Sequence, residues 1–154
     1  ELVEMLQHQR RSISGRIINE TVNAQKTPWG KLKAAIYTHL YLSEAMQPWF
    51  YFSFMEAKNL NKEERKKAVL SEQNSEKMFT EIIKEGQAEG VFSDCHGELA
   101  AGQIKALLQD WYLKHSKYTK RNVTVEQYAK LTLEFVEAFL MNGAKASSTS
   151  LTPS

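Results

Sequence analysis

Residues 61–90 read NKEERKKAVLSEQNSEKMFTEIIKEGQAEG, and this stretch carries the clearest helix signals in the chain. Asn61 is a favourable N-cap, and Glu64 three residues later completes a capping-box arrangement. Gly90 is placed to end the helix in the left-handed conformation, and Gly86 one turn earlier predicts some fraying. The apolar side chains of the stretch recur at helical spacing along one face: Leu70, Met78, Phe79, Ile82 and Ile83. The stretch therefore predicts one long amphipathic helix.

Three further helices are expected before this stretch. A helix over residues 2–22 is predicted from apolar residues at roughly helical spacing: Leu2, Leu6, Ile13 and Ile17. The next helix begins at Thr27, a good N-cap, with Pro28 at the first helical position. Pro48 opens a third, shorter helix that runs to about residue 58.

Two more helices are expected after the stretch. One covers residues 97–116, and a basic loop over residues 117–123 follows it. The last helix begins at Thr124, where Gln127 completes a second capping box, and Gly143 ends it. Strand-like alternation of useful length is missing from the sequence. The sequence therefore predicts an all-α fold, a six-helix bundle.

Composition sets the broad class of the protein. The chain has 154 residues, 42% hydrophobic and 25% charged, which is ordinary for one soluble domain. A net charge of +2 does not by itself suggest a nucleic-acid partner. Cys95 is the one cysteine, which fits a reducing cytoplasm, and no apolar run is long enough to cross a membrane. We expect one domain over residues 1–143 and a disordered tail over 144–154.

Metal binding and catalysis have no support in the sequence. The four histidines are scattered and no Glu-x-x-His pair exists, so no metal site is expected. Nucleophile-elbow, phosphate-loop and dinucleotide motifs are missing as well. We therefore expect neither an enzyme nor a cofactor.

Three segments resemble the C-terminal domain of TetR-family transcriptional regulators. The opening Glu1-Leu2 is similar to the junction where the helix-turn-helix head of that family runs into its connecting helix. Residues 82–92, IIKEGQAEGVF, are similar to the family's I-x-x-G-x-x-x-G-x-F segment, and 98–101, ELAA, resemble the usual start of the next helix. Residues 107–111, LLQDW, and 125–129, VEQYA, resemble the two last helices that dimerise in the family.

The resemblance implies a homodimer and a missing head. No helix-turn-helix domain is present in the chain, so binding to operator DNA is expected only through a separate N-terminal domain. The last two helices carry more apolar surface than one bundle can hide, and are expected to form a four-helix interface with a second copy. The predicted interface residues are Leu107, Trp111, Tyr128, Leu131, Phe135 and Phe139.

Residues 49–55, WFYFSFM, predict the wall of a ligand cavity. So many aromatic residues cannot all face one stripe of a short helix, although core packing alone is an open alternative. His39 is equally open, because a lone histidine on an apolar face is more often a hydrogen-bonded core residue. The predicted ligand-binding residues are Tyr37, His39, Leu40, Tyr41, Phe50, Phe54, Met78, Phe79, Ile82, Trp111 and Tyr112.

The sequence and the resemblance together predict a cytoplasmic regulator, expected to be a repressor. A small apolar or aromatic effector would shift the first helix and thereby the DNA-binding head. A free-standing carrier of hydrophobic ligands, or a pure dimerisation module with a filled core, are the alternatives.

Overall fold

The computed structural model describes residues 2–142, and all regular secondary structure in this part of the chain is helical. The all-α class is confirmed, whereas the predicted tail over 144–154 lies outside the described residues. The elements, in chain order, are α1 (Leu2–Asn23), α2 (Pro28–Ala45), α3 (Gln47–Met55), η1 (Ala57–Asn59), α4 (Lys62–Ala88), α5 (Gly97–Leu113), α6 (His115–Lys120), α7 (Val125–Glu137) and η2 (Ala138–Asn142).

The predicted helix starts are confirmed by their caps. The Thr27 side chain accepts a hydrogen bond from the Gly30 amide at 3.0 Å. Asn61 accepts one from the Glu64 amide at 2.8 Å. At the start of α7 the full capping box forms, because the Thr124 hydroxyl also caps the helix and the Gln127 side chain accepts from the Thr124 amide at 2.9 Å. Each cap satisfies amides that the first turn would otherwise leave unpaired.

The end of α4 depends on two glycines. Gly90 has φ +76°, the left-handed conformation predicted for it. Gly86 lies inside the helix, which continues to Ala88, and the predicted fraying is not seen. The ring of Phe92 folds back onto Gly86, where a Cβ atom would lie only 2.1 Å from the ring. Gly86 therefore lets the loop after α4 close over the helix.

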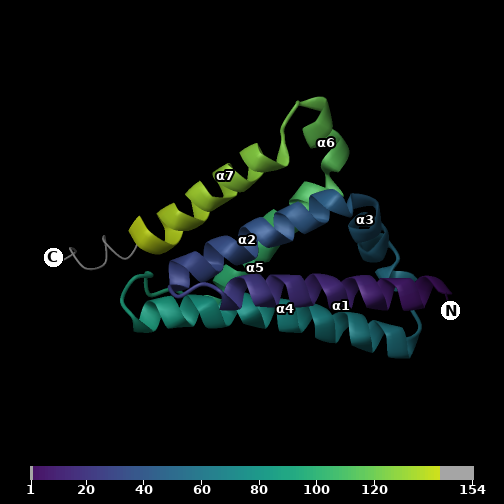
Figure 1. Cartoon of the computed structure of the whole chain (residues 1–154), viewed down its shortest axis with the longest axis horizontal. Helices are drawn as coiled ribbons and strands as arrows, with labels where there is room; N and C mark the ends of the chain where they lie inside the picture. The colour runs from purple at the N-terminus through teal and green to yellow at the C-terminus, as the bar shows by residue number, and fades with distance from the viewer. Residues whose placement is uncertain (1, 143–154) are drawn as a thin grey trace.

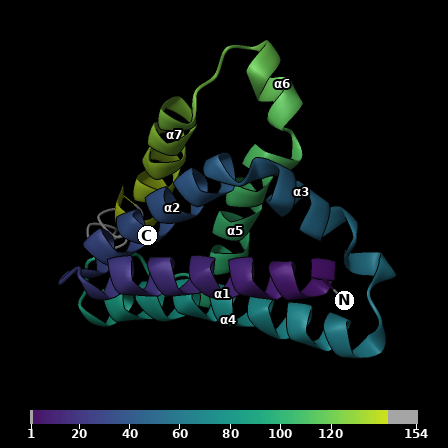
Figure 2. The same ribbon diagram turned by 45° about the vertical axis from the view of Figure 1, so that its right-hand side comes forward.

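In space, α1 and α4 run side by side in the same direction and form one long edge of the molecule (Figures 1 and 2). The central helix is α2, which packs against α1, α4, α5 and α7. α5 also packs on α4, while α6 lies at the end of the molecule far from α1 and α4, and α7 runs from there back along α2 (Figure 2). Among the fully buried side chains, Leu32, Ile36 and Leu40 of α2 meet Ile83 of α4 and Leu108 of α5 in one core.

The predicted basic loop over residues 117–123 is wrong, because most of it forms the short helix α6. Tyr118 anchors this helix: its ring stacks on Trp111 at 5.3 Å, and its hydroxyl donates a hydrogen bond to Asp110. The positive charges are also partly neutralised, since Lys114 pairs with Asp110 at 3.0 Å. Side chains from α5 thus stabilise α6, a helix that could not be predicted from its own sequence.

The apolar stripe predicted for α1 faces outward. Leu2, Ile13 and Ile17 are exposed, whereas the buried positions of the helix are Gln7, Ser14 and Val22. The inward face is therefore largely polar in its first half, which is the reverse of an ordinary amphipathic helix.

Candidate functional site

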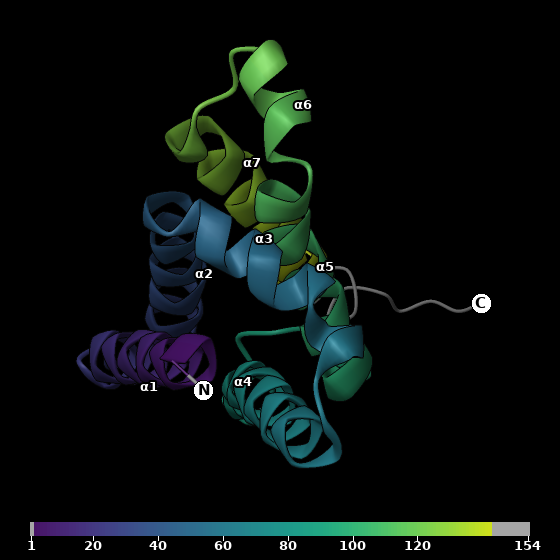
Figure 3. The same cartoon turned by 90° about the vertical axis from the view of Figure 1, so that its right-hand side faces the viewer.

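A cavity of about 1030 Å³ lies between the first five α-helices. Residues of α1, α3 and α4 supply most of its lining, and Figure 3 shows how these three helices are arranged. α1 packs along α2 and not along α4, so the space between α1 and α4 stays open. The volume suits a small organic molecule, since ligand cavities commonly measure several hundred Å³.

Five of the eleven predicted ligand-binding residues line this cavity: His39, Phe50, Phe54, Met78 and Tyr112. Four others are buried in the bundle: Leu40, Phe79, Ile82 and Trp111. Tyr37 and Tyr41 are largely exposed and pack against each other. Each lies two residues from His39, which is about 200° around a helix, so they point away from the cavity.

Most of the lining residues from α1 and α4 were not predicted from the sequence. Arg11, Ser14 and Ile18 come from α1, and Val69 and Leu70 from α4. The inward face of α1 could have been recognised from the residues at positions 7, 11, 14, 18 and 22, which share one face at helical spacing. The apolar row on the opposite face concealed it.

Aromatic rings form one wall of the cavity. The Phe50 ring lies 4.8 Å from Trp49, 5.3 Å from Tyr112 and 5.9 Å from His39, measured between ring centroids. Edge-on and tilted contacts of this kind are favourable for aromatic pairs. Phe54 of α3 also lines the cavity, whereas Tyr51 and Phe52 of the same helix do not.

Four buried polar atoms without a hydrogen-bond partner belong to residues on this cavity. They are the hydroxyl oxygens of Ser14 and Ser53, the Nδ1 atom of His39 and the Nε1 atom of Trp49. A buried polar group without a partner is costly, and native structures contain few of them. Each of these atoms would gain a hydrogen-bond partner if a polar ligand group or an ordered water lay beside it.

His39 is neutral at physiological pH. Burial, and secondarily the positive charge of Lys105, lower the pKa of its imidazole to about 3. Lys105 itself is buried, and it pairs with Glu72 at 3.3 Å and donates to the Ser75 hydroxyl at 2.9 Å. The imidazole can therefore offer one donor and one acceptor to a ligand.

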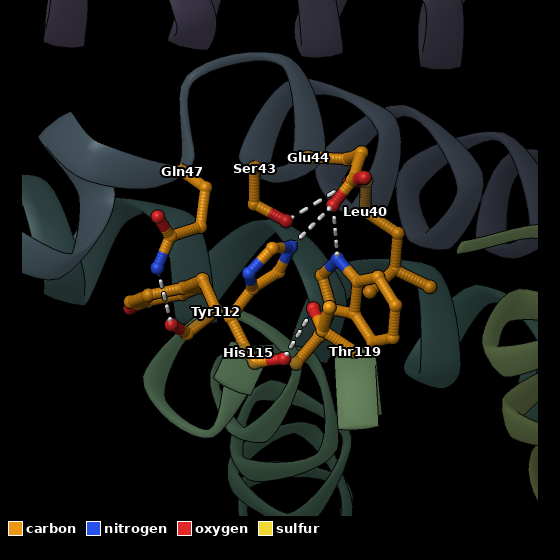
Figure 4. Close-up of polar contacts among 8 residues, drawn as sticks. Leu40, Ser43, Glu44, Gln47, Tyr112, His115 and Thr119 are labelled. Carbon is orange, nitrogen blue, oxygen red and sulfur yellow. Dashed lines mark hydrogen bonds and ion pairs between the residues drawn. The ribbon is translucent and has the colours of Figure 1, made fainter. Parts of the chain in front are cut away.

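A polar cluster holds the end of α2 and the start of α3 against α5 and α6 (Figure 4). One carboxylate oxygen of Glu44 contacts both the Trp111 indole nitrogen and His115 Nε2 at 3.2 Å. Gln47 donates to the backbone carbonyl of Tyr112 at 3.1 Å (Figure 4). The cluster thereby fixes the part of α5 that presents the Tyr112 ring to the cavity.

The predicted interface residues fall into two groups. Leu131, Phe135 and Phe139 are 53%, 62% and 57% exposed and follow one another at intervals of four residues. Trp111 and Tyr128 instead pack together inside the chain at 5.1 Å, and Leu107 is half-buried. We name these three exposed residues the α7 stripe, although Phe139 lies in η2, directly after α7.

Two other features are missing from residues 2–142. No cluster of histidine, cysteine and carboxylate side chains suited to a metal occurs in that range. None of the helices there is long and apolar enough to span a membrane.

Comparison with known proteins gives one family and one fold. Residues 25–136 match the tetracyclin repressor-like C-terminal domain. The structure is similar to that of a bacterial regulatory protein in the TetR family from Rhodococcus RHA1, with a TM-score of 0.68 and 18% identity over 86% of this chain and 73% of that one. Among curated proteins no match is found. The family match covers most of the chain, and the chain therefore belongs to the tetracyclin repressor-like (TetR) family of transcription regulators, as its C-terminal domain.

Proposed function

We propose that this domain binds a small apolar or aromatic effector in the cavity between α1 and α4 and thereby controls a transcriptional repressor. In this proposal the regulator acts in the cytoplasm as a homodimer and catalyses no reaction. It contacts operator DNA only through an N-terminal helix-turn-helix domain.

The observation that carries the proposal is the cavity itself. Its wall combines the rings of Phe50 and Phe54 with buried polar atoms that lack partners, such as Ser53 Oγ. Apolar walls with a few polar groups are typical of small-molecule sites. A pure dimerisation module would have no use for such a space.

Control of DNA binding is proposed to run through α1. This helix packs on α2 along one side and borders the cavity along another. A ligand that binds one position of α1 more tightly than another would shift the population of the two arrangements.

Dimerisation is proposed to use the α7 stripe together with exposed apolar residues of α5 such as Leu99. Large apolar side chains in a row are seldom left in water by a monomer. A stable two-fold interface of this class buries on the order of 2,000 Å² in total.

A thermal-shift experiment with a filled-cavity variant tests the effector site. Ala68 lines the cavity on α4, so Ala68→Trp should occupy part of the space. Acyl, aromatic and terpenoid compounds are added to the wild type and the variant. A compound at 100 times its Kd should stabilise the wild type by about 2.7 kcal/mol and the variant far less.

The matched control is Ala45→Trp, an exposed position of α2 away from the cavity, which should respond like the wild type. The proposal fails if Ala68→Trp, shown to be folded by circular dichroism, is stabilised as strongly as the wild type.

A further inference from the structure

The cavity has an excess of basic side chains. Its lining includes two acidic residues, Glu20 and Glu72, against five basic ones: Arg11, Arg16, Arg65, Lys67 and Lys105. The whole chain is almost balanced, with 20 basic and 18 acidic residues. The excess positive charge is therefore concentrated around the cavity.

Of these five basic side chains, one takes part in an ion pair among the described residues. Lys105 is paired with Glu72. Arg65 donates a hydrogen bond to the backbone carbonyl of Lys58. A carbonyl group has no net charge, so this contact does not neutralise the guanidinium. None of the ion pairs among the described residues involves Arg11 or Lys67. A ligand that carries negative charge would supply the missing counter-charge.

Arg11 is the best placed of these cations. It is half-buried, and burial lowers the pKa of its guanidinium below the ordinary value. Ser14 follows one turn later on the same inward face, more than nine-tenths buried, with a hydroxyl that has no partner. A guanidinium and a hydroxyl on one helix face form a donor set for a carboxylate, which Arg binds through two parallel hydrogen bonds.

Lys67 extends this donor set from the opposite wall. Arg11 and Lys67 line the large cavity and also a neighbouring cavity of about 310 Å³, whose lining includes the acidic Glu64 as well as His8 and Leu60. They therefore stand where the two spaces meet, one on α1 and the other near the start of α4. The aromatic wall belongs to a third element, α3, so the cavity offers separate surfaces to an apolar body and to an acidic group.

We propose that the effector is an amphipathic organic acid, whose apolar body packs on the α3 wall and whose carboxylate is bound by Arg11 and Ser14 of α1 and by Lys67 of α4. The inference rests on the proposed function, because it assigns a chemical class to the effector of that cavity. A neutral ligand would remove water from Arg11 without giving it a charged partner.

Two ligands of equal chain length test the inference: decanoate and 1-decanol. Their binding to the full chain is measured by isothermal titration calorimetry. Decanoate should bind the wild type about tenfold more tightly or better, as expected for charge-assisted hydrogen bonds. Arg11→Gln should remove most of that preference and leave the affinity for decanol unchanged, which also shows that the variant is folded.

Arg10→Gln is the matched control, because Arg10 is an exposed neighbour that does not line either cavity. It should keep the preference for decanoate. Equal affinity of the wild type for the two ligands would overturn the organic-acid inference and leave the proposed effector site intact. A preference that survives Arg11→Gln would overturn it as well. Failure of both ligands to bind would count against the proposed function itself.

Discussion

Two phenylalanines allow the role of core packing to be tested separately from that of ligand binding. Phe79 is fully buried in the core, whereas Phe54 is 47% exposed and lines the cavity. We expect Phe79→Ala to lower the free energy of unfolding by about 3–5 kcal/mol, because it leaves a void in close-packed surroundings. Phe54→Ala should cost far less and instead weaken effector binding. Urea denaturation of both variants measures the difference, and an equal loss at the two positions would contradict the assignment of Phe54 to the cavity wall.

His39 should make stability depend on pH. Its pKa is about 3 in the folded chain and 6.5 when unperturbed, chiefly through burial. Below pH 6.5 the unfolded chain binds a proton that the folded chain does not, so the free energy of unfolding falls as the pH falls towards 3. The loss should be roughly 1 kcal/mol for each pH unit.

The comparison variant is His39→Gln, whose amide does not titrate. Denaturation between about pH 6 and pH 4.5 should show a steeper loss of stability for the wild type than for the variant. Parallel curves would mean that the imidazole gains a proton without cost, and hence that it is not desolvated.

At the scale of single residues, the features that could be predicted from the sequence were those that depend on neighbouring residues. The caps at Thr27, Asn61 and Thr124 and the left-handed Gly90 were predictable because each depends on residues within one turn. The direction in which each side chain of α2 points could not be predicted in the same way. Most residues near His39 are apolar or aromatic, so periodicity could not tell which of them reach the cavity.

At the scale of elements, α1 and α6 show what could not be predicted from the sequence pattern. In α1 the apolar row was visible, but its direction depends on how the helix packs against α2. In α6 the sequence is short and basic, and the helix is stabilised by Tyr118 stacking on Trp111. Both outcomes come from contacts between elements, which a single sequence does not display.

The α7 stripe yields a prediction at the same scale. Phe135 is its central and most exposed residue, so Phe135→Glu places a charge in the proposed interface and leaves the core untouched. We expect the variant to sediment as a monomer at concentrations where the wild type is a dimer, since a desolvated charge opposes association. Met55→Glu, an equally apolar exposed position on α3, is the control and should stay dimeric. A monomeric wild type would remove the proposed interface.

At the scale of the whole molecule, the long helix α4, the helix order and the all-α class were predictable, because caps and periodicity repeat along the chain. The cavity was predictable only in part. α3 revealed one wall through its aromatic residues, whereas the walls from α1 and α4 exist because these two helices run side by side without packing together. That gap is a property of the assembled bundle and has no signature in either helix.

The same gap predicts how the molecule responds to its effector. α1 is held mainly by α2, so it should open locally more often than α5, which packs against α2, α4 and other elements. A ligand between α1 and α4 would add contacts to the less stable helix. Hydrogen exchange in saturating decanoate should therefore slow most for amides of residues 7–18 and little for α7. Simple stabilisation of the whole fold would slow only the amides that exchange through global unfolding, and by one common factor. Such a uniform change, or unaltered exchange in α1, would rule out α1 as the element through which the effector acts.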